Sequence, residues 1–172
     1  EDLKVIDLPD ITLLPGLMDA HVHLIGNTDL KGYEGLSESS YLSTIYGVEN
    51  AKDTLMAGFT TVRNVGASNY SDVALKQAIA KQAVLGPTLL VSGPPLGITG
   101  GHCDSNTLPY DFKYTSDGVA DGPWEVRRKV RENRKYGADL IKFCATGGVL
   151  SKNTNLGTTQ YTADEMEAIV DE

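Results

Sequence analysis

Residues 17–24, Leu-Met-Asp-Ala-His-Val-His-Leu, are the stretch of sequence that decides the fold. In a β-strand, successive side chains point to opposite faces, so Leu17, Asp19, His21 and His23 would share one face. The four residues between them are wholly apolar and should pack against a core. Two imidazoles at this spacing can bind one metal ion, and clustered histidine and carboxylate groups suit zinc-type ions. The stretch therefore predicts a metal site; the alternative is two surface histidines that bind nothing.

Length and charge limit the classes of protein to consider. A chain of 172 residues can form one domain with a sizeable core. Its 15 basic and 23 acidic residues give a formal charge of −8, which argues against a nucleic-acid partner, since such proteins usually carry a basic patch. No apolar run is long enough to cross a bilayer, so we expect no membrane partner.

The cysteines and the N-terminus bear on the compartment. Two cysteines, Cys103 and Cys144, make no disulfide framework, and we interpret them as small buried apolar residues. No secretory signal opens the chain, which favours the cytoplasm. Because Glu1 is not a methionine, however, we expect the natural N-terminus to lie upstream, and the localisation stays unknown on sequence alone.

Strand and helix patterns alternate along the chain. Residues 3–14 read as one or two short strands with a turn at Pro9-Asp10, and residues 26–38 as a long loop. Helices are predicted over residues 39–56, 71–85 and 123–136, and a fourth begins at a capping box, Thr162 to Glu165. A β-rich run follows each of the first three helices, starting at Gly58, Gly86 and Gly137.

This alternation predicts parallel βαβ units, which occur in an open doubly wound sheet or in a (β/α)₈ barrel. The doubly wound sheet usually has a glycine-rich phosphate turn after its first strand. Residues 23–28, His-Leu-Ile-Gly-Asn-Thr, do not match that turn. Barrel enzymes carry catalytic residues at the C-terminal ends of their strands, where His21 and His23 fall. We therefore favour an α/β (TIM) barrel, of which this chain would supply about the first four β/α units.

Lys142 lies in residues 139–144, a run otherwise suited to a buried parallel strand, and shares a face with Leu140 and Cys144. A lysine in such a strand is costly unless its charge is paired or lost. It could form an ion pair with a carboxylate at the barrel mouth. Alternatively, burial lowers its pKa, and the neutral amine adds carbon dioxide to become a carbamate that can bridge two metal ions.

Other segments leave alternatives open. His102, in the glycine-rich loop 93–104, could be a third metal ligand, a substrate contact or a plain loop residue, and we favour the substrate contact. Residues 145–151 could offer backbone N–H groups to an anion or form a tight turn. Arg63 is interpreted as a structural tie. The basic run 127–135 is interpreted as the solvated face of a helix.

Four motifs together resemble a known family. Residues 15–23, Pro-Gly-Leu-Met-Asp-Ala-His-Val-His, resemble the first-strand signature of the amidohydrolase superfamily. With residues 58–63, 97–104 and 141–151, the chain resembles the branch that contains zinc-dependent Xaa-Pro dipeptidases and carboxypeptidases releasing C-terminal arginine or lysine. The segment around Lys142 is the most specific part of this resemblance.

The resemblance implies a (β/α)₈ barrel with two Zn²⁺ ions. His21 and His23 would bind one metal ion, and Lys142, as N6-carboxylysine, would bridge both. The family's remaining ligands lie on strands five, six and eight, which this sequence does not contain. Residues 1–14 would be the remnant of a flanking β-sandwich and residues 15–172 the first half of the barrel. The chain alone would then be inactive and need the C-terminal half, and we expect the full-length protein to be a homo-oligomer.

The implied activity is metal-dependent hydrolysis of a small peptide, at an Xaa-Pro bond or before a C-terminal arginine or lysine, by a metal-activated bridging water. Lys142 and His102 would be the catalytic residues of this chain, with His102 holding the substrate's carbonyl or carboxylate. Two alternatives remain: an amidohydrolase acting on a cyclic amide or imidazolone-type ring, and a metal-binding fragment without activity.

Overall fold

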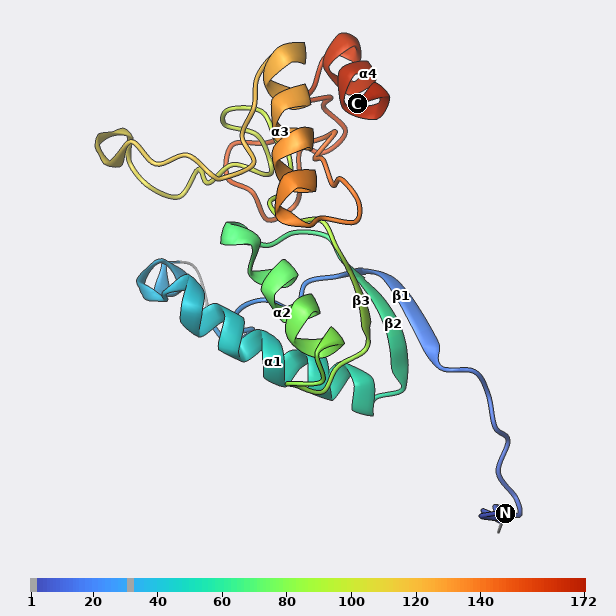
Figure 1. Ribbon diagram of the computed structural model, residues 1–172. Helices are drawn as coiled ribbons and strands as arrows, with labels where there is room; N and C mark the ends of the chain where they lie inside the picture. The colour runs from blue at the N-terminus through green and yellow to red at the C-terminus, as the bar shows by residue number, and fades with distance from the viewer. Residues whose placement is uncertain (1–2, 31–32) are drawn as a thin grey trace.

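The computed structural model describes residues 3–30 and 33–172 (Figure 1). Glu1 and Asp2 of the predicted sandwich remnant, and Lys31 and Gly32 of the predicted loop, lie outside the described residues. The strands and α-helices, in chain order, are β1 (Leu17–Val22), α1 (Ser40–Met56), β2 (Phe59–Asn64), α2 (Ser71–Ala80), β3 (Thr88–Val91), α3 (Pro123–Tyr136) and α4 (Ala163–Asp171). Short 3₁₀ turns occur at Glu34–Ser37, Ser68–Tyr70 and Tyr110–Phe112.

The three strands form a parallel sheet in the order β1-β2-β3. Figure 1 shows α1 and α2 together on one side of this sheet. The segment that begins at Asp139 lies beside β3 in space, because the N–H of Asp139 donates to the carbonyl of Val91 over 2.8 Å. The sequential order from β1 to this segment is that of a barrel, whereas a doubly wound sheet would place its fourth strand beside β1.

Local sequence explains where the helices begin and end. Ser39 caps α1 by accepting a hydrogen bond from the N–H of Leu42 over 3.3 Å. Pro123 occupies the first turn of α3, and Gly137 ends that helix in the left-handed conformation with φ of 104°. The predicted helix 71–85 is too long: α2 ends at Ala80 because the chain turns at Gln82, which has φ of 57°.

Two apolar clusters form the core. The first joins the sheet to α1 and α2, and its buried members are Leu24, Ala51, Val62, Val73, Leu75, Leu89 and Val91. The second lies beneath α3 and α4, and its buried members are Leu96, Ala120, Val126, Val130, Tyr161, Ala168 and Ile169. In Figure 1 the two groups of helices occupy opposite ends of the molecule.

The predicted fourth strand is only partly formed. Phe143 makes a single parallel bridge with Leu96, whose N–H donates to the carbonyl of Lys142 and whose carbonyl accepts from the N–H of Cys144. The segment therefore runs where a strand would, but too few ladder bonds form to continue β3 as regular structure. The predicted strands in residues 3–14 are absent from the described residues, although the turn at Pro9-Asp10 is present.

Two further predictions are corrected. The structure joins Cys103 and Cys144 in a disulfide, so they are not separate buried thiols. Their separation of 41 residues in sequence is bridged by the fold, which brings the two loops together. The apolar face of β1 is also not fully packed, because Met18 is 76 % exposed at the edge of the sheet.

Among the described residues, no helix combines the length and hydropathy that crossing a bilayer requires.

Candidate functional site

A cavity of about 310 Å³ opens beyond the C-terminal end of β1. All four residues predicted for the site line it: His21, His23, His102 and Lys142. Loop residues complete the wall, namely Val65, Pro95, Cys103, Phe143, Cys144, Ala145, Thr146, Gly147 and Gly148. Lys142 therefore lines the same cavity as the two histidines of β1.

The two imidazoles of β1 lie close together at this cavity. The ring centroids of His21 and His23 are 5.3 Å apart, with the ring planes inclined by 65°. Burial lowers the pKa of His23, and the positive charges of His21 and Lys142 lower it further, although a hydrogen bond to the carbonyl of Gly66 opposes them. His23 is therefore neutral at neutral pH, which is the form that can bind a metal ion.

Asp19 does not join the histidines, although strict alternation would place it on their face. Its Oδ1 accepts a hydrogen bond from the N–H of His21 over 2.9 Å, and its side chain lines a different hollow together with Asp53. The pairing of β1 with β2 is irregular between Asp19 and Val22, and such an irregularity breaks the alternation of faces. In the described ranges, no three His, Cys, Asp or Glu side chains are grouped to hold a metal ion.

The side chains at the cavity that could bind a metal ion are thus the imidazoles of His21, His23 and His102 and the amine of Lys142. Lys142 is partly buried, and no carboxylate lies within ion-pair distance of it in the part of the chain that the structure describes. The predicted ion pair at the barrel mouth therefore has no partner among these residues. Two histidines beside an unpaired lysine fit the lysine-bridged metal centre that the sequence predicts, as one half of its ligand set.

His102 is held by the loop that follows Lys142. Its Nδ1 lies 2.9 Å from Oγ of Ser151, and its backbone N–H donates to Oε1 of Gln160 over 3.0 Å. Its ring packs directly over the backbone of Gly148, where any side chain would collide with it. Sequence reasoning did not find these neighbours; the Gly147-Gly148 pair was the available signal, since only glycine allows this close an approach.

The loop 145–151 forms a tight turn rather than an anion cradle. The N–H of Gly147 donates to the carbonyl of Thr158 over 3.2 Å, and that of Gly148 donates to Oγ1 of Thr154 over 3.2 Å. These two donors are taken up by Thr158 and Thr154, in the segment that follows the loop, so the turn interpretation holds for them. The oxygen of Thr154 also contacts Oγ of Ser151, which links the turn to His102.

Arg63 has the structural role predicted for it, whereas the basic run of α3 is only partly the solvated face that the sequence predicted. Arg63 donates from Nε to the carbonyl of Ala20 over 2.6 Å and so ties β2 to β1. On α3, Arg127 pairs with Asp171 over 2.8 Å, and Arg131 makes bonds of 2.6 and 2.8 Å to the carboxylate of Glu172. The basic run of α3 is therefore engaged in part by ion pairs to the C-terminal end of α4.

Comparisons with known proteins agree with this geometry. The sequence profile described as "Amidohydrolase family" matches residues 12–172. Ochratoxinase from Aspergillus niger is 33% identical over 177 aligned residues, which cover 93% of this chain and 36% of that protein. The chain thus spans little more than a third of the curated relatives that it matches.

Solved structures give the same result. A Xaa-Pro dipeptidase with bound methionine in its active site has a TM-score of 0.79 at 35% identity, over 91% of this chain and 40% of that one. The structure of A. niger ochratoxinase has a TM-score of 0.81 at 30% identity, with the same coverage. A prolidase complexed with N-methylphosphonate-L-proline has a TM-score of 0.76 at 33% identity, over 98% of this chain and 44% of that one.

Proposed function

The chain belongs to the amidohydrolase family and carries the N-terminal β/α units of its TIM barrel, and from this premise we propose that the complete protein hydrolyses an amide bond in a small substrate. The favoured substrate is a dipeptide with proline as its second residue, because Xaa-Pro dipeptidase and prolidase structures are among the neighbours above 30% identity. Removal of a C-terminal arginine or lysine is the related possibility.

A non-peptide amide is the second candidate substrate. It is favoured by the likeness to ochratoxinase, whose name indicates action on ochratoxin. The two candidates share the reaction type and differ in the group that flanks the amide. Hydrolysis of a cyclic amide would need the same strand histidines, but none of the relatives described above is named for that activity.

Two Zn²⁺ ions are the cofactors that we propose for the complete site. His21 and His23 would bind one of them, and Lys142 would bridge both as N6-carboxylysine. Bound zinc would supply Lewis-acid activation of a water molecule and of the scissile carbonyl. The carbamate would form when the amine of Lys142, after loss of its proton, adds carbon dioxide and releases a second proton. Among the described residues no carboxylate pairs with that amine, which supports this role.

His102 would bind the substrate rather than a metal ion. Its Nδ1 is engaged by Ser151, so Nε2 is the nitrogen that remains for a ligand in the cavity. A ring held in this way can bond the substrate's carbonyl or terminal carboxylate and fix its orientation. The position of His102 on a loop, away from the paired rings of β1, supports this role over metal ligation.

The convergence of His21, His23, His102 and Lys142 on one cavity is the observation that carries the proposal. To test it, the complete protein is loaded with zinc and its rate of hydrolysis is measured on a panel of substrates. The panel contains Xaa-Pro dipeptides, peptides ending in arginine or lysine, ochratoxin and a cyclic amide. We expect the Xaa-Pro dipeptides to be cleaved fastest. Cleavage of ochratoxin alone would select the second candidate, and inertness toward the whole panel would refute amide hydrolysis.

A substitution separates the two roles of the histidines. His102→Ala should raise KM or lower kcat about tenfold or more while bound zinc is unchanged, because a substrate contact is lost and no ligand is. His21→Ala is the matched comparison and should lower zinc content as well as activity. Elemental analysis measures the zinc content of both variants, and steady-state kinetics measures their kcat and KM. Loss of zinc from the His102 variant would make His102 a ligand and contradict our assignment.

A further inference from the structure

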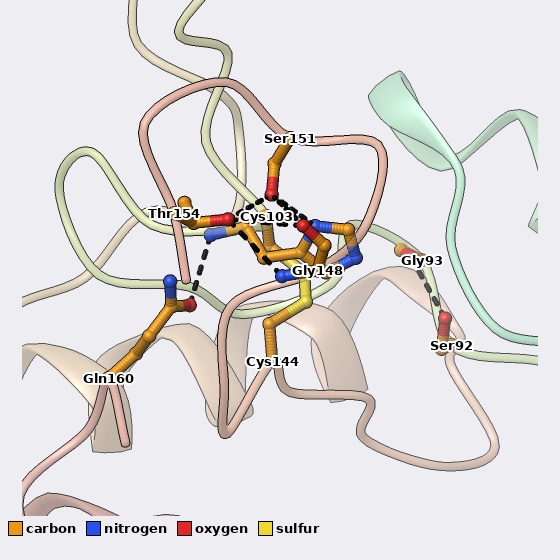
Figure 2. Close-up of a disulfide and its surroundings, with 9 residues drawn as sticks. Ser92, Gly93, Cys103, Cys144, Gly148, Ser151, Thr154 and Gln160 are labelled. Atoms are coloured by element: carbon orange, nitrogen blue, oxygen red, sulfur yellow. Dashed lines mark hydrogen bonds between the residues drawn. A yellow bond between two sulfur atoms is a disulfide. The ribbon is translucent and has the colours of Figure 1, made fainter. Parts of the chain in front are cut away.

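The disulfide joins the two loops that carry His102 and Lys142. Cys103 directly follows His102, and Cys144 lies two residues after Lys142. Their Cα atoms are 5.9 Å apart, and both residues line the cavity that holds the histidines. Figure 2 shows the bond between the loop of Cys103 and the loop that continues to Gly148 and Ser151. The cross-link is therefore built into the wall of the site.

The other attachments of His102 itself are hydrogen bonds that water can replace. The buried bridge between Leu96 and Phe143 joins the same two loops at a point six residues before His102. His102 lies against Gly148, bonds Ser151 through its ring and bonds Gln160 through its backbone. His102 itself is exposed, so each of these bonds competes with solvent and is weak on balance. The disulfide closes a ring of contacts from Cys103 through Cys144 and Ser151 back to His102. Apart from the peptide chain itself, it is the covalent link in that ring.

We propose that the Cys103–Cys144 disulfide is a positioning element that holds the His102 loop against the Lys142 loop, and that its reduction releases His102 and weakens substrate binding. The restraint on the loop follows from the structure alone. The consequence for substrate binding rests on the proposed function. Cys103 and Cys144 act through His102 and touch no reacting atom in this scheme.

A small reductant can reach this bond. Cys103 is partly exposed in the cavity wall, whereas Cys144 is 6 % exposed. A trialkylphosphine attacks one sulfur and breaks the S–S bond, and water then hydrolyses the adduct. The phosphine ends as its oxide with the oxygen of water, and the two protons of water complete the two thiols. The disulfide gains two electrons, which the phosphorus loses.

Hydrogen exchange of the chain, followed by mass spectrometry with and without the phosphine, tests the restraint. We expect reduction to speed amide exchange about tenfold in residues 98–106 and 145–151, because the loops then open locally, and to leave β2 and β3 unchanged. The double variant Cys103→Ser with Cys144→Ser should exchange like the reduced chain and ignore the phosphine. Ser151→Ala is the matched control: it removes one hydrogen bond, so it should have a smaller effect and stay sensitive to reduction.

Kinetics of the zinc-loaded complete protein test the consequence. Reduction, or the double serine variant, should raise KM about tenfold with kcat and bound zinc little changed, because the substrate contact loosens and the metal ligands do not. A phosphine is used because it avoids the zinc chelation of dithiols. Equal KM in the oxidised and reduced protein would overturn the proposal, as would free thiols at both cysteines in the air-oxidised protein or identical exchange with and without reductant. A protein that shows the exchange response but cleaves no substrate would instead refute the proposed function and leave the restraint standing.

Discussion

The sheet region, made of β1, β2 and β3 with α1 and α2, and the loop region, made of residues 94–161 with α3 and α4, hold their side chains in different ways. In the sheet region, parallel pairing and a buried apolar cluster fix the backbone. In the loop region, isolated bridges, a disulfide and the α3–α4 ion pairs replace a continuous ladder. The site takes His21 and His23 from the first and His102 and Lys142 from the second. One half of the site is thus set by regular structure and the other by individual contacts.

The two regions also shift the pKa of a buried carboxyl group in opposite directions. Asp72 is fully buried in the sheet region and accepts bonds from Asn64 and from the N–H of Gly93, yet burial outweighs these bonds and raises its pKa. Glu165 is buried in the loop region, where burial alone would raise its pKa. Hydrogen bonds from the backbone of Thr162 and Gly122 prevail and lower it. The carboxylate of Glu165 therefore favours the folded state, whereas that of Asp72 opposes it.

A large effect is expected from a cavity in the sheet region. Leu75 is 1 % exposed in the first cluster, so Leu75→Ala should reduce the free energy of unfolding by about 2–5 kcal/mol. Leu85→Ala is the matched control, because that leucine is exposed and leaves no cavity. Urea denaturation of both variants measures the difference. Similar losses in the two would show that the sheet region does not depend on its core.

An intermediate effect is expected from pH, with opposite signs in the two regions. A lowered pKa means that Glu165 stabilises above its unfolded pKa and loses that contribution as pH falls through its folded pKa. A raised pKa means that Asp72 destabilises once pH rises above its folded pKa, and acidification removes this cost. The cost of Asp72 is therefore removed first, as pH falls toward its ordinary pKa, and the contribution of Glu165 is lost below its own ordinary pKa. Between neutral pH and about pH 3, a range that extends below the ordinary carboxyl pKa, acidification should weaken α4 relative to the sheet.

Glu165→Gln and Asp72→Asn isolate the two contributions. Glu165→Gln should cost about 1 kcal/mol at neutral pH, as loss of a helix cap does. It should also make the stability of the loop region less dependent on pH. Asp72→Asn should likewise remove the gain in stability that acidification brings to the sheet region. Amide exchange of each region across this pH range is the measurement. If acidification changed the stability of both regions in the same direction, the roles given to Glu165 and Asp72 would be wrong.

The smallest effect concerns two tyrosine hydroxyls. Tyr161 is 1 % exposed in the second cluster, and its hydroxyl has no hydrogen-bond partner within the described residues. Tyr161→Phe should be neutral or stabilise by up to about 1 kcal/mol, since it removes an unsatisfied buried group. Tyr70→Phe is the comparison and should cost about 0.5–1.5 kcal/mol, because that hydroxyl donates to Asn133 over 3.0 Å. Thermal or urea unfolding ranks the two, and a loss on Tyr161→Phe would reveal an unseen partner.

The outcome of sequence reasoning follows the same division. Local patterns sufficed for the sheet region, where period-two spacing placed His21 and His23 on one face. In the loop region, a capping box located only the start of α4. The register irregularity that turns Asp19 away depends on pairing with β2 and leaves no local signal. The loop region depends on contacts between distant segments, so spacing could not show that Cys103 meets Cys144 or that His102 meets Ser151. The metal-ligand and substrate roles of these residues stay predictions.

The exposed position of β1 has a consequence for handling the protein. Within the described residues β1 pairs with β2 only, so its outer row of N–H and C=O groups has no strand beside it, and Leu17 and Met18 are exposed there. An open strand edge with apolar side chains is a template on which another extended chain can add. Aggregation of this chain would therefore begin at the same strand that carries the two histidines, and a self-associated preparation would bury the residues on which metal binding is to be measured.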